Sequence, residues 1–131
     1  MGGATRNILI AEDNLPLATI LEFNLSRAGF AVTLAGDGQT ASRIAQRETF
    51  DLIITDHQMP GKNGEELCQS IRQDSVNSDV PIALCSAKGL EVDAERLSSE
   101  YGVVKVFCKP FSPSEIVAFA RALLETERVC P

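Results

Sequence analysis

The fold is decided by the stretch Phe50-Asp51-Leu52-Ile53-Ile54-Thr55-Asp56-His57-Gln58-Met59-Pro60. Its three consecutive branched aliphatic residues are typical of a strand that is buried on both faces of a sheet. Because Pro60 lacks an N–H and has a fixed φ angle, the strand is expected to stop before it. The carboxylate of Asp56 is therefore placed at the carboxyl end of a central strand, where open α/β sheets bind their ligands.

The composition is that of an ordinary globular domain. Of the 131 residues, 44% are apolar and 23% are charged, which suits a chain with a core of its own. We expect a single domain over residues 1–131, in which residues 1–6 are a frayed or non-native tail. The net charge of −6 argues against nucleic acid or an anionic membrane as a direct partner. Because we find no spanning segment and no signal-peptide pattern, we expect a cytoplasmic protein.

The four cysteines lie in separate segments and form no C-x-x-C pair; they are Cys68, Cys85, Cys108 and Cys130. We interpret them as reduced thiols, mostly in the core, and not as disulfide partners or metal ligands. Cys85 and Cys108 each precede a polar residue at the end of a strand. Strand alternation therefore predicts that both thiols face away from the strand-end site and into the core.

Strands and helices alternate along the rest of the chain. In addition to the central strand, buried strands are predicted at residues 7–11, 30–35, 80–85 and 103–108, and helices follow from about residues 14, 38, 65, 90 and 112. The helix from residue 90 has the weakest apolar stripe. Five strands alternating with five helices predict an α/β fold, a flavodoxin-like doubly wound parallel sheet with strand order 2-1-3-4-5 and helices on both faces.

This strand order brings several chemically active side chains to one edge of the sheet. Glu12 and Asp13 follow the first strand and lie beside Asp56. At ~4 Å and an effective dielectric near 20, each like-charge pair costs about 4 kcal/mol, so the cluster calls for a cation. Oxygen-only ligands suit Mg²⁺. Lys109 and Ser86, at the ends of the fifth and fourth strands, add a positive charge and a hydroxyl, which completes a set suited to phosphoryl transfer onto aspartate.

These strand ends resemble those of the response-regulator receiver domains of two-component signalling, the CheY-like family. The resemblance extends from Ile8 to about Leu124. Four short motifs carry the resemblance: Glu12-Asp13, Asp56 with Met59-Pro60 and Gly64, Ser86-Ala87, and Lys109-Pro110-Phe111. Each motif alone is weak evidence for the family, but the four together and in this order are specific. The resemblance implies a phosphorylatable signalling switch and not an enzyme.

The resemblance also implies the role of each acidic residue. Asp56 would be the phosphoacceptor, taking the group from a phosphohistidine on a sensor histidine kinase or phosphotransfer protein. Mg²⁺, with Mn²⁺ as an alternative, would be held directly by Asp13 and Asp56, through water by Glu12, and by the backbone carbonyl of Gln58. The downstream partner or output domain is left open by the sequence.

Further roles follow from the same resemblance. Ser86 would swing inward to bond the phosphoryl group, Lys109 would pair with it, and the Lys109-Pro110 peptide bond would be cis. The side chains of Gln58 and Lys88 would influence how fast the aspartyl phosphate hydrolyses. One position departs from the family: Val106 stands where an aromatic residue is usual, which puts an aromatic switch in doubt.

Other interpretations stay open at this point. The chain could be a degenerate receiver that acts as a constitutive protein-binding scaffold. Alternatively, Gly36-Asp37-Gly38 begins a G-x-G-x-x-A pattern after a strand, which would make the chain a nucleotide-binding module. Ser86 could simply cap the next helix. His57, the one histidine, is expected to point away from the carboxylates by strand alternation.

Overall fold

The structure, a computed structural model, describes residues 5–73, 76–87 and 93–129. Within these residues, five strands alternate with five helices, as predicted. In chain order the elements are β1 (Asn7–Ala11), α1 (Leu15–Arg27), β2 (Ala31–Ala35), α2 (Gly38–Arg47), β3 (Leu52–Asp56), α3 (Gly64–Gln73), β4 (Ile82–Ser86), α4 (Ala94–Tyr101), β5 (Val103–Cys108) and α5 (Pro113–Val129). None of the described helices is both long and apolar enough to span a membrane.

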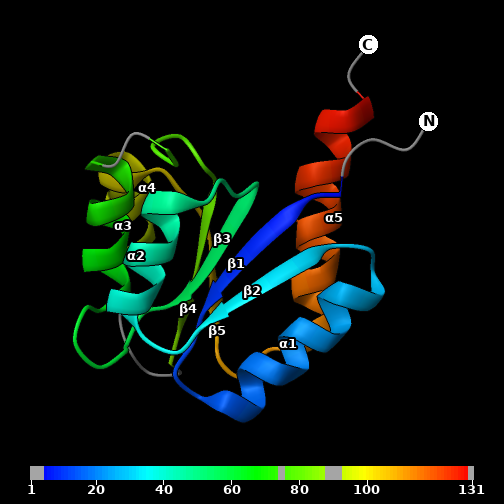
Figure 1. Ribbon diagram of the computed structural model, residues 1–131, viewed down its shortest axis with the longest axis horizontal. Helices are drawn as coiled ribbons and strands as arrows, with labels where there is room; N and C mark the ends of the chain where they lie inside the picture. Colours follow the sequence, from blue (N-terminus) through cyan, green and yellow to red (C-terminus); the bar gives the residue numbers. More distant parts are fainter. Residues whose placement is uncertain (1–4, 74–75, 88–92, 130–131) are drawn as a thin grey trace.

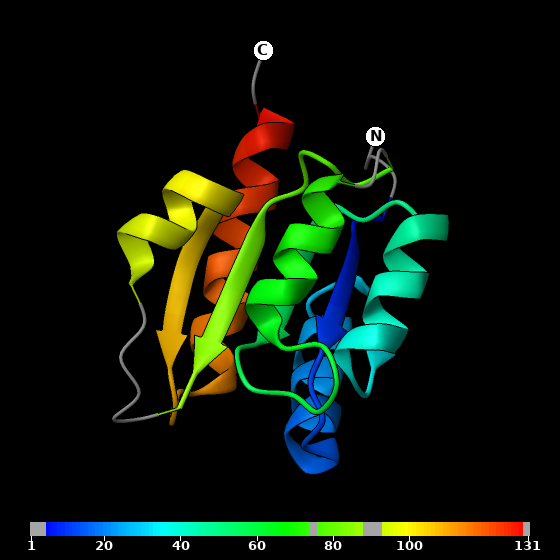
Figure 2. The same ribbon diagram turned by 90° about the vertical axis from the view of Figure 1, so that its left-hand side faces the viewer.

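The strands form one sheet in the order β2-β1-β3-β4-β5, and every neighbouring pair is parallel. Helices α2, α3 and α4 cover one face of this sheet, and α1 and α5 cover the other (Figure 1). Figure 2 looks onto the face that carries α2, α3 and α4. The predicted fold class and strand order are therefore confirmed, and each face of the sheet has its own apolar core.

The central strand β3 is buried along its whole length. Ile53 packs into the core under α2, α3 and α4, whereas Leu52 and Ile54 pack into the core under α1 and α5. Alternate residues of a strand point to opposite faces, so a strand covered on both sides needs apolar residues at successive positions. This explains the uninterrupted aliphatic run, and it leaves Asp56 at the end of the strand.

Some element boundaries differ from the predicted ones. β4 begins at Ile82 and not at residue 80, because Val80 N–H bonds to Asn77 in a turn at 3.2 Å and Pro81 has no N–H for the sheet. Asp93 caps α4 by accepting a bond from the Arg96 N–H. The start predicted for this helix, at residue 90, falls outside the described residues.

The cysteine prediction is partly wrong. Cys68 and Cys85 are buried free thiols, and burial raises the pKa of each thiol to about 12. Cys108 is exposed and not in the core. It lies at the end of β5, an edge strand, and among the described residues its side of this strand is covered by the short helix α4; Val104, on the same side, is 50% exposed. Cys130 lies outside the described residues.

A buried amide joins three segments at the end of the sheet opposite the carboxyl ends of the strands. Asn77 is 3% exposed. Its Nδ2 donates to the carbonyl of Ala45 at 2.5 Å and to that of Glu48 at 2.8 Å, and its Oδ1 accepts from Phe50 N–H at 3.0 Å. The side chain thereby ends α2, fixes the loop into β3 and holds the loop before β4.

We expect Asn77→Ala to lower the free energy of unfolding by roughly 2–4 kcal/mol, because buried backbone groups lose their partners. Urea unfolding followed by circular dichroism measures the change. The matched control is Asn24→Ala, whose amide donates to the Ile20 carbonyl in an exposed hydrogen bond on α1; this variant should stay within about 0.5 kcal/mol of wild type. Equal effects of the two substitutions would contradict the role given to Asn77.

Candidate functional site

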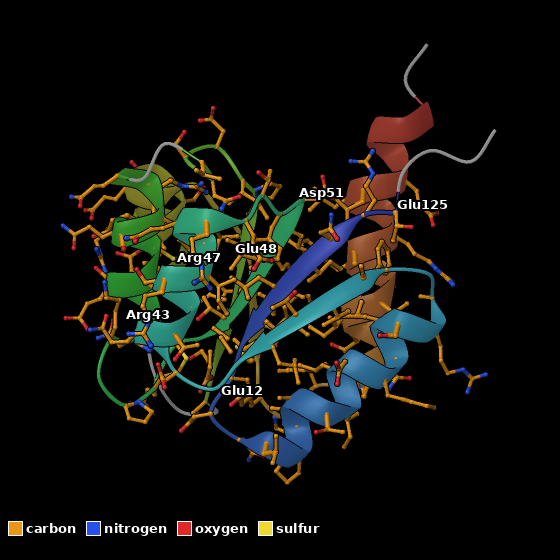
Figure 3. The ribbon with its side chains drawn as sticks, in the orientation of Figure 1. Glu12, Arg43, Arg47, Glu48, Asp51 and Glu125 are labelled. Atoms are coloured by element: carbon orange, nitrogen blue, oxygen red, sulfur yellow. The ribbon has the colours of Figure 1, made fainter. Side chains whose placement is uncertain are left out.

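The carboxyl ends of β1 and β3 bring three carboxylates together. Side-chain oxygens of Glu12, Asp13 and Asp56 all lie within 4.8 Å of one another. Glu12 and Asp56 are only 4% and 6% exposed, whereas Asp13 is exposed. In Figure 3, Glu12 lies at the edge of the sheet where β1 ends, and Asp51 lies at the opposite edge. The structure thus confirms the prediction that these three acids converge.

Lys109 supplies the positive charge at this edge. It follows β5, and its Nζ lies 3.0 Å from Asp56 Oδ1 and 3.3 Å from Glu12 Oε1. Its backbone N–H donates to the carbonyl of Ser86 at 2.7 Å, which fixes the end of β5 beside the end of β4. The Lys109-Pro110 peptide bond is cis, as the resemblance implied.

The protonation equilibria of the site follow from burial. Desolvation raises the pKa of Asp56, although the Lys109 ammonium opposes this, and the nearby Asp13 carboxylate adds to it. Desolvation likewise raises the pKa of Glu12. A hydrogen bond from Asn14 N–H, at 3.1 Å, works to lower this pKa but is outweighed. Burial works to lower the pKa of Lys109, but the Asp56 and Glu12 carboxylates outweigh it and raise that pKa. The ammonium therefore stays charged.

The donor set fits a divalent metal ion. With all three acids ionised, the cluster carries three negative charges against the single positive charge of Lys109. All the side-chain donors of the cluster are oxygens, which Mg²⁺ and other hard cations prefer over nitrogen or sulfur. A dication would cancel the remaining charge, and its site would be completed by backbone carbonyls or water.

The other predicted residues follow β3, β4 and β5 or lie within them. Ser86 ends β4 and is 1% exposed; its hydroxyl lies 3.4 Å from the Ala87 carbonyl, and α4 is capped by Asp93 and not by Ser86. Gln58 is exposed in the loop after β3. Lys88, the other residue expected to influence hydrolysis, falls outside the described residues. Val106 is partly buried against the core under α4.

His57 does not join the carboxylates. It lies close enough to Glu65, at the start of α3, to lower that acid's pKa, although the Arg96 hydrogen bond is the main cause. The Nδ1 atom of His57 is buried and bonds to no described residue.

The Gly36-Asp37-Gly38 motif has a structural role. The Asp37 carboxylate caps α2 by accepting a bond from Thr40 N–H at 2.7 Å, and this bond lowers the pKa of Asp37. Gly38 lies directly against the backbone of Lys62. A dinucleotide fold would need this helix terminus and this glycine free for a pyrophosphate. Here both are occupied by the chain itself, which argues against a nucleotide-binding module.

Two contacts around the site gave no signal in the sequence. One is the approach of Gly38 to Lys62. The other is an ion pair between α3 and α4, in which Arg96 reaches both oxygens of Glu65 at 2.8 and 3.0 Å and also Glu100 at 3.0 Å. Both join segments far apart in the chain, and neither depends on a periodic pattern. The spacing of Arg96 and Glu100, four residues apart on one helix, is the one part that sequence could have indicated.

Comparisons with a family model and with solved structures point to the same family. Residues 8–121 match the family described as the response regulator receiver domain. The receiver domain of a sensor histidine kinase from Pseudomonas aeruginosa, solved with a magnesium ion in its active-site cleft, is 30% identical, with 93% of this chain and 99% of that chain covered and a TM-score of 0.81. A putative response regulator from Chloroflexus aurantiacus has the same identity, coverage and TM-score. The chemotaxis protein CheY4 of Vibrio cholerae is 26% identical, over 92% of this chain and 100% of that one, with a TM-score of 0.83.

The raised pKa values of the buried carboxylates determine how the stability of the fold changes with pH. Because the pKa values of Glu12 and Asp56 are higher in the folded than in the unfolded chain, the folded state binds more protons as these groups titrate. Their contribution to stability is therefore greatest below the unfolded-state pKa values. It falls as pH rises through the folded-state values and stays low above them.

In metal-free buffer at pH 7, we accordingly expect Asp56→Asn to raise the free energy of unfolding by about 1 kcal/mol and Tm by roughly 3–5 °C. The amide removes a buried charge, and Lys109 keeps Glu12 as its partner. Thermal denaturation with a chelator present measures the shift. Asp79→Asn, at an exposed position before β4, is the control and should leave Tm unchanged. A loss of stability in Asp56→Asn would refute the explanation.

Proposed function

Because the chain belongs to the response regulator receiver domain family, we propose that it is a phosphorylatable switch in which Asp56 accepts a phosphoryl group. The observation that carries this proposal is the cluster of three carboxylates at the ends of β1 and β3, two of which contact Lys109 at the end of β5. In this proposal, residues 1–131 form one receiver domain. Its donor would be a phosphohistidine on a sensor histidine kinase or a phosphotransfer protein.

In the proposed reaction, an Asp56 carboxylate oxygen attacks the phosphorus of the phosphohistidine. A P–O bond forms as the P–N bond breaks, and the electron pair leaves with the imidazole nitrogen, which is protonated from solvent. Burial supports this step because a carboxylate with a raised pKa is more basic and so a better nucleophile. Lys109, 3.0 Å from Asp56 Oδ1, keeps that carboxylate ionised before transfer and pairs with the phosphoryl oxygens afterwards.

The other site residues have supporting roles in this proposal. Asp13, Asp56 and the Gln58 carbonyl would hold Mg²⁺ directly, and Glu12 would hold it through water. When bound, the metal supplies positive charge to the phosphoryl oxygens. Ser86, buried at the end of β4, would donate its hydroxyl proton to a phosphoryl oxygen. That donation would replace the weak 3.4 Å contact that the hydroxyl makes with the Ala87 carbonyl.

We expect acetyl phosphate or phosphoramidate with Mg²⁺ to add one acid-stable, hydroxylamine-labile phosphoryl group to the wild-type protein. Intact-mass spectrometry measures the product. Asp56→Asn should stay unmodified because the amide is not a nucleophile, and Asp79→Asn, remote from the site, should be labelled like wild type. An unmodified wild type would favour the constitutive scaffold instead. Undiminished labelling of Asp56→Asn would place the phosphoacceptor elsewhere.

The role of Lys109 can be separated from metal binding. Lys109→Ala removes the ammonium that faces Asp56 and Glu12, but it leaves every proposed metal ligand in place. We expect this variant to bind Mg²⁺ at least as tightly as wild type, since a competing positive charge is gone. It should nevertheless lose most of the phosphorylation-induced change in its amide NMR spectrum. Comparable loss of Mg²⁺ binding and of the spectral change would count against Lys109 as a partner of the phosphoryl group.

A further inference from the structure

Gly38, at the first position of α2, is in contact with the loop that follows β3. A Cβ atom built on Gly38 would overlap the carbonyl oxygen of Lys62 and would lie 2.8 Å from both the carbonyl carbon and the Cβ of Lys62. Real Cβ atoms do not come so close to backbone atoms, so this approach requires glycine. Gly36, two residues earlier, has nothing within 4 Å of the same constructed atom.

The loop in question, residues 57–63, contains Gln58 and is held at its other points as well. His57 N–H donates to the Cys85 carbonyl at 2.7 Å, and the His57 carbonyl accepts from Gly64 N–H at 2.9 Å. Met59 is 8% exposed and packs into the core under α2, α3 and α4. These contacts fix the start of the loop, join its two ends and anchor Met59. Asn63 N–H donates to Glu66 Oε1 at 2.9 Å, and the contact with Gly38 adds a further point of support at Lys62.

A side chain at position 38 would displace the loop and not the helix. Helix α2 is held to the sheet by the fully buried Ala41 and Ala45. It is also held to α3 by a 2.8 Å hydrogen bond between the hydroxyls of Ser42 and Ser70. The loop, by contrast, is exposed at residues 60–61 and bends there through a glycine at φ +75°. The loop is therefore the part that yields.

We propose that Gly38 is a positioning residue for the metal site: by letting the loop lie against α2, it holds the Gln58 carbonyl where Mg²⁺ requires a ligand. The inference rests on the proposed function. Mg²⁺ demands nearly ideal octahedral geometry with short metal–oxygen distances, so a small displacement of one carbonyl weakens binding. The three atoms nearest to a Cβ built on Gly38 all belong to Lys62, which is not a proposed metal ligand. The effect of Gly38 passes through the backbone of Lys62.

The test compares Gly38→Ala with Gly36→Ala, which adds the same methyl group to the same connection without a contact. Isothermal titration of Mg²⁺ should show a Kd raised about tenfold in Gly38→Ala, the size typical for residues that orient metal ligands. Gly36→Ala should stay within about twofold of wild type. The rate of phosphorylation by phosphoramidate should be reduced in Gly38→Ala at low Mg²⁺ and should recover at saturating Mg²⁺. A general folding defect would not recover.

A second pair of variants covers the case in which Gly38→Ala does not fold. Lys62→Gly and Lys62→Ala both remove the ammonium, but only Lys62→Gly frees the backbone that rests on Gly38. Lys62→Gly should therefore raise the Mg²⁺ Kd several-fold more than Lys62→Ala does.

The outcomes separate this inference from the proposed function. If wild type and Gly36→Ala bind Mg²⁺ and Gly38→Ala binds it equally well, Gly38 is not a positioning residue and the proposed function stands. Equal Kd values for the two Lys62 variants would overturn the inference in the same way. If wild type does not bind Mg²⁺ at all, the proposed metal site fails together with this inference.

Discussion

The repulsion among three carboxylates at one edge of the sheet is the constraint on which the site depends. Glu12 and Asp56 are almost fully buried, and Asp13 is close enough for oxygens of all three to lie within 4.8 Å. Lys109 is the cation that reaches two of the acids. It does so because β5 runs parallel to β1 and β3 and ends at the same edge. The parallel sheet thus creates the charge conflict and also brings in the residue that offsets part of it.

The end of β3 is linked to the surface helix α4 through the start of α3. A Cβ on Gly64 would overlap the Asp56 carbonyl oxygen and lie 2.9 Å from His57 Cα, so α3 begins directly against the strand end. The next residue, Glu65, holds Arg96 of α4 through both of its oxygens. Val106, partly buried beside these elements, has no ring that could rotate between two positions. The Glu65–Arg96 ion pair adds to the apolar packing of α3 and α4 and does not depend on an aromatic residue at 106.

Strand alternation predicted the burial of Cys85 correctly but failed for Cys108. Both thiols precede a polar residue at a strand end, and alternation placed both in the core. Cys85 is in β4, which has a neighbouring strand on each side, and it is buried. Cys108 is in the edge strand β5, and in the described part of the chain its side of that strand is covered by the eight residues of α4. Alternation tells which side of a strand a residue faces, but not whether anything covers that side.

The sequence by itself determined the strand order, the double-sided burial of β3 and the convergence of Glu12, Asp13, Asp56 and Lys109. Hydrophobic periodicity marks each element, and the handedness of parallel crossovers leaves few ways to arrange them. Only the tertiary structure decided the approach of Gly38 to Lys62, the pairing of Glu65 with Arg96 and the bonds of Asn77 to the end of α2 and the loop that follows it. These contacts join segments far apart in the chain, where exact distances depend on packing and leave no periodic trace in the sequence.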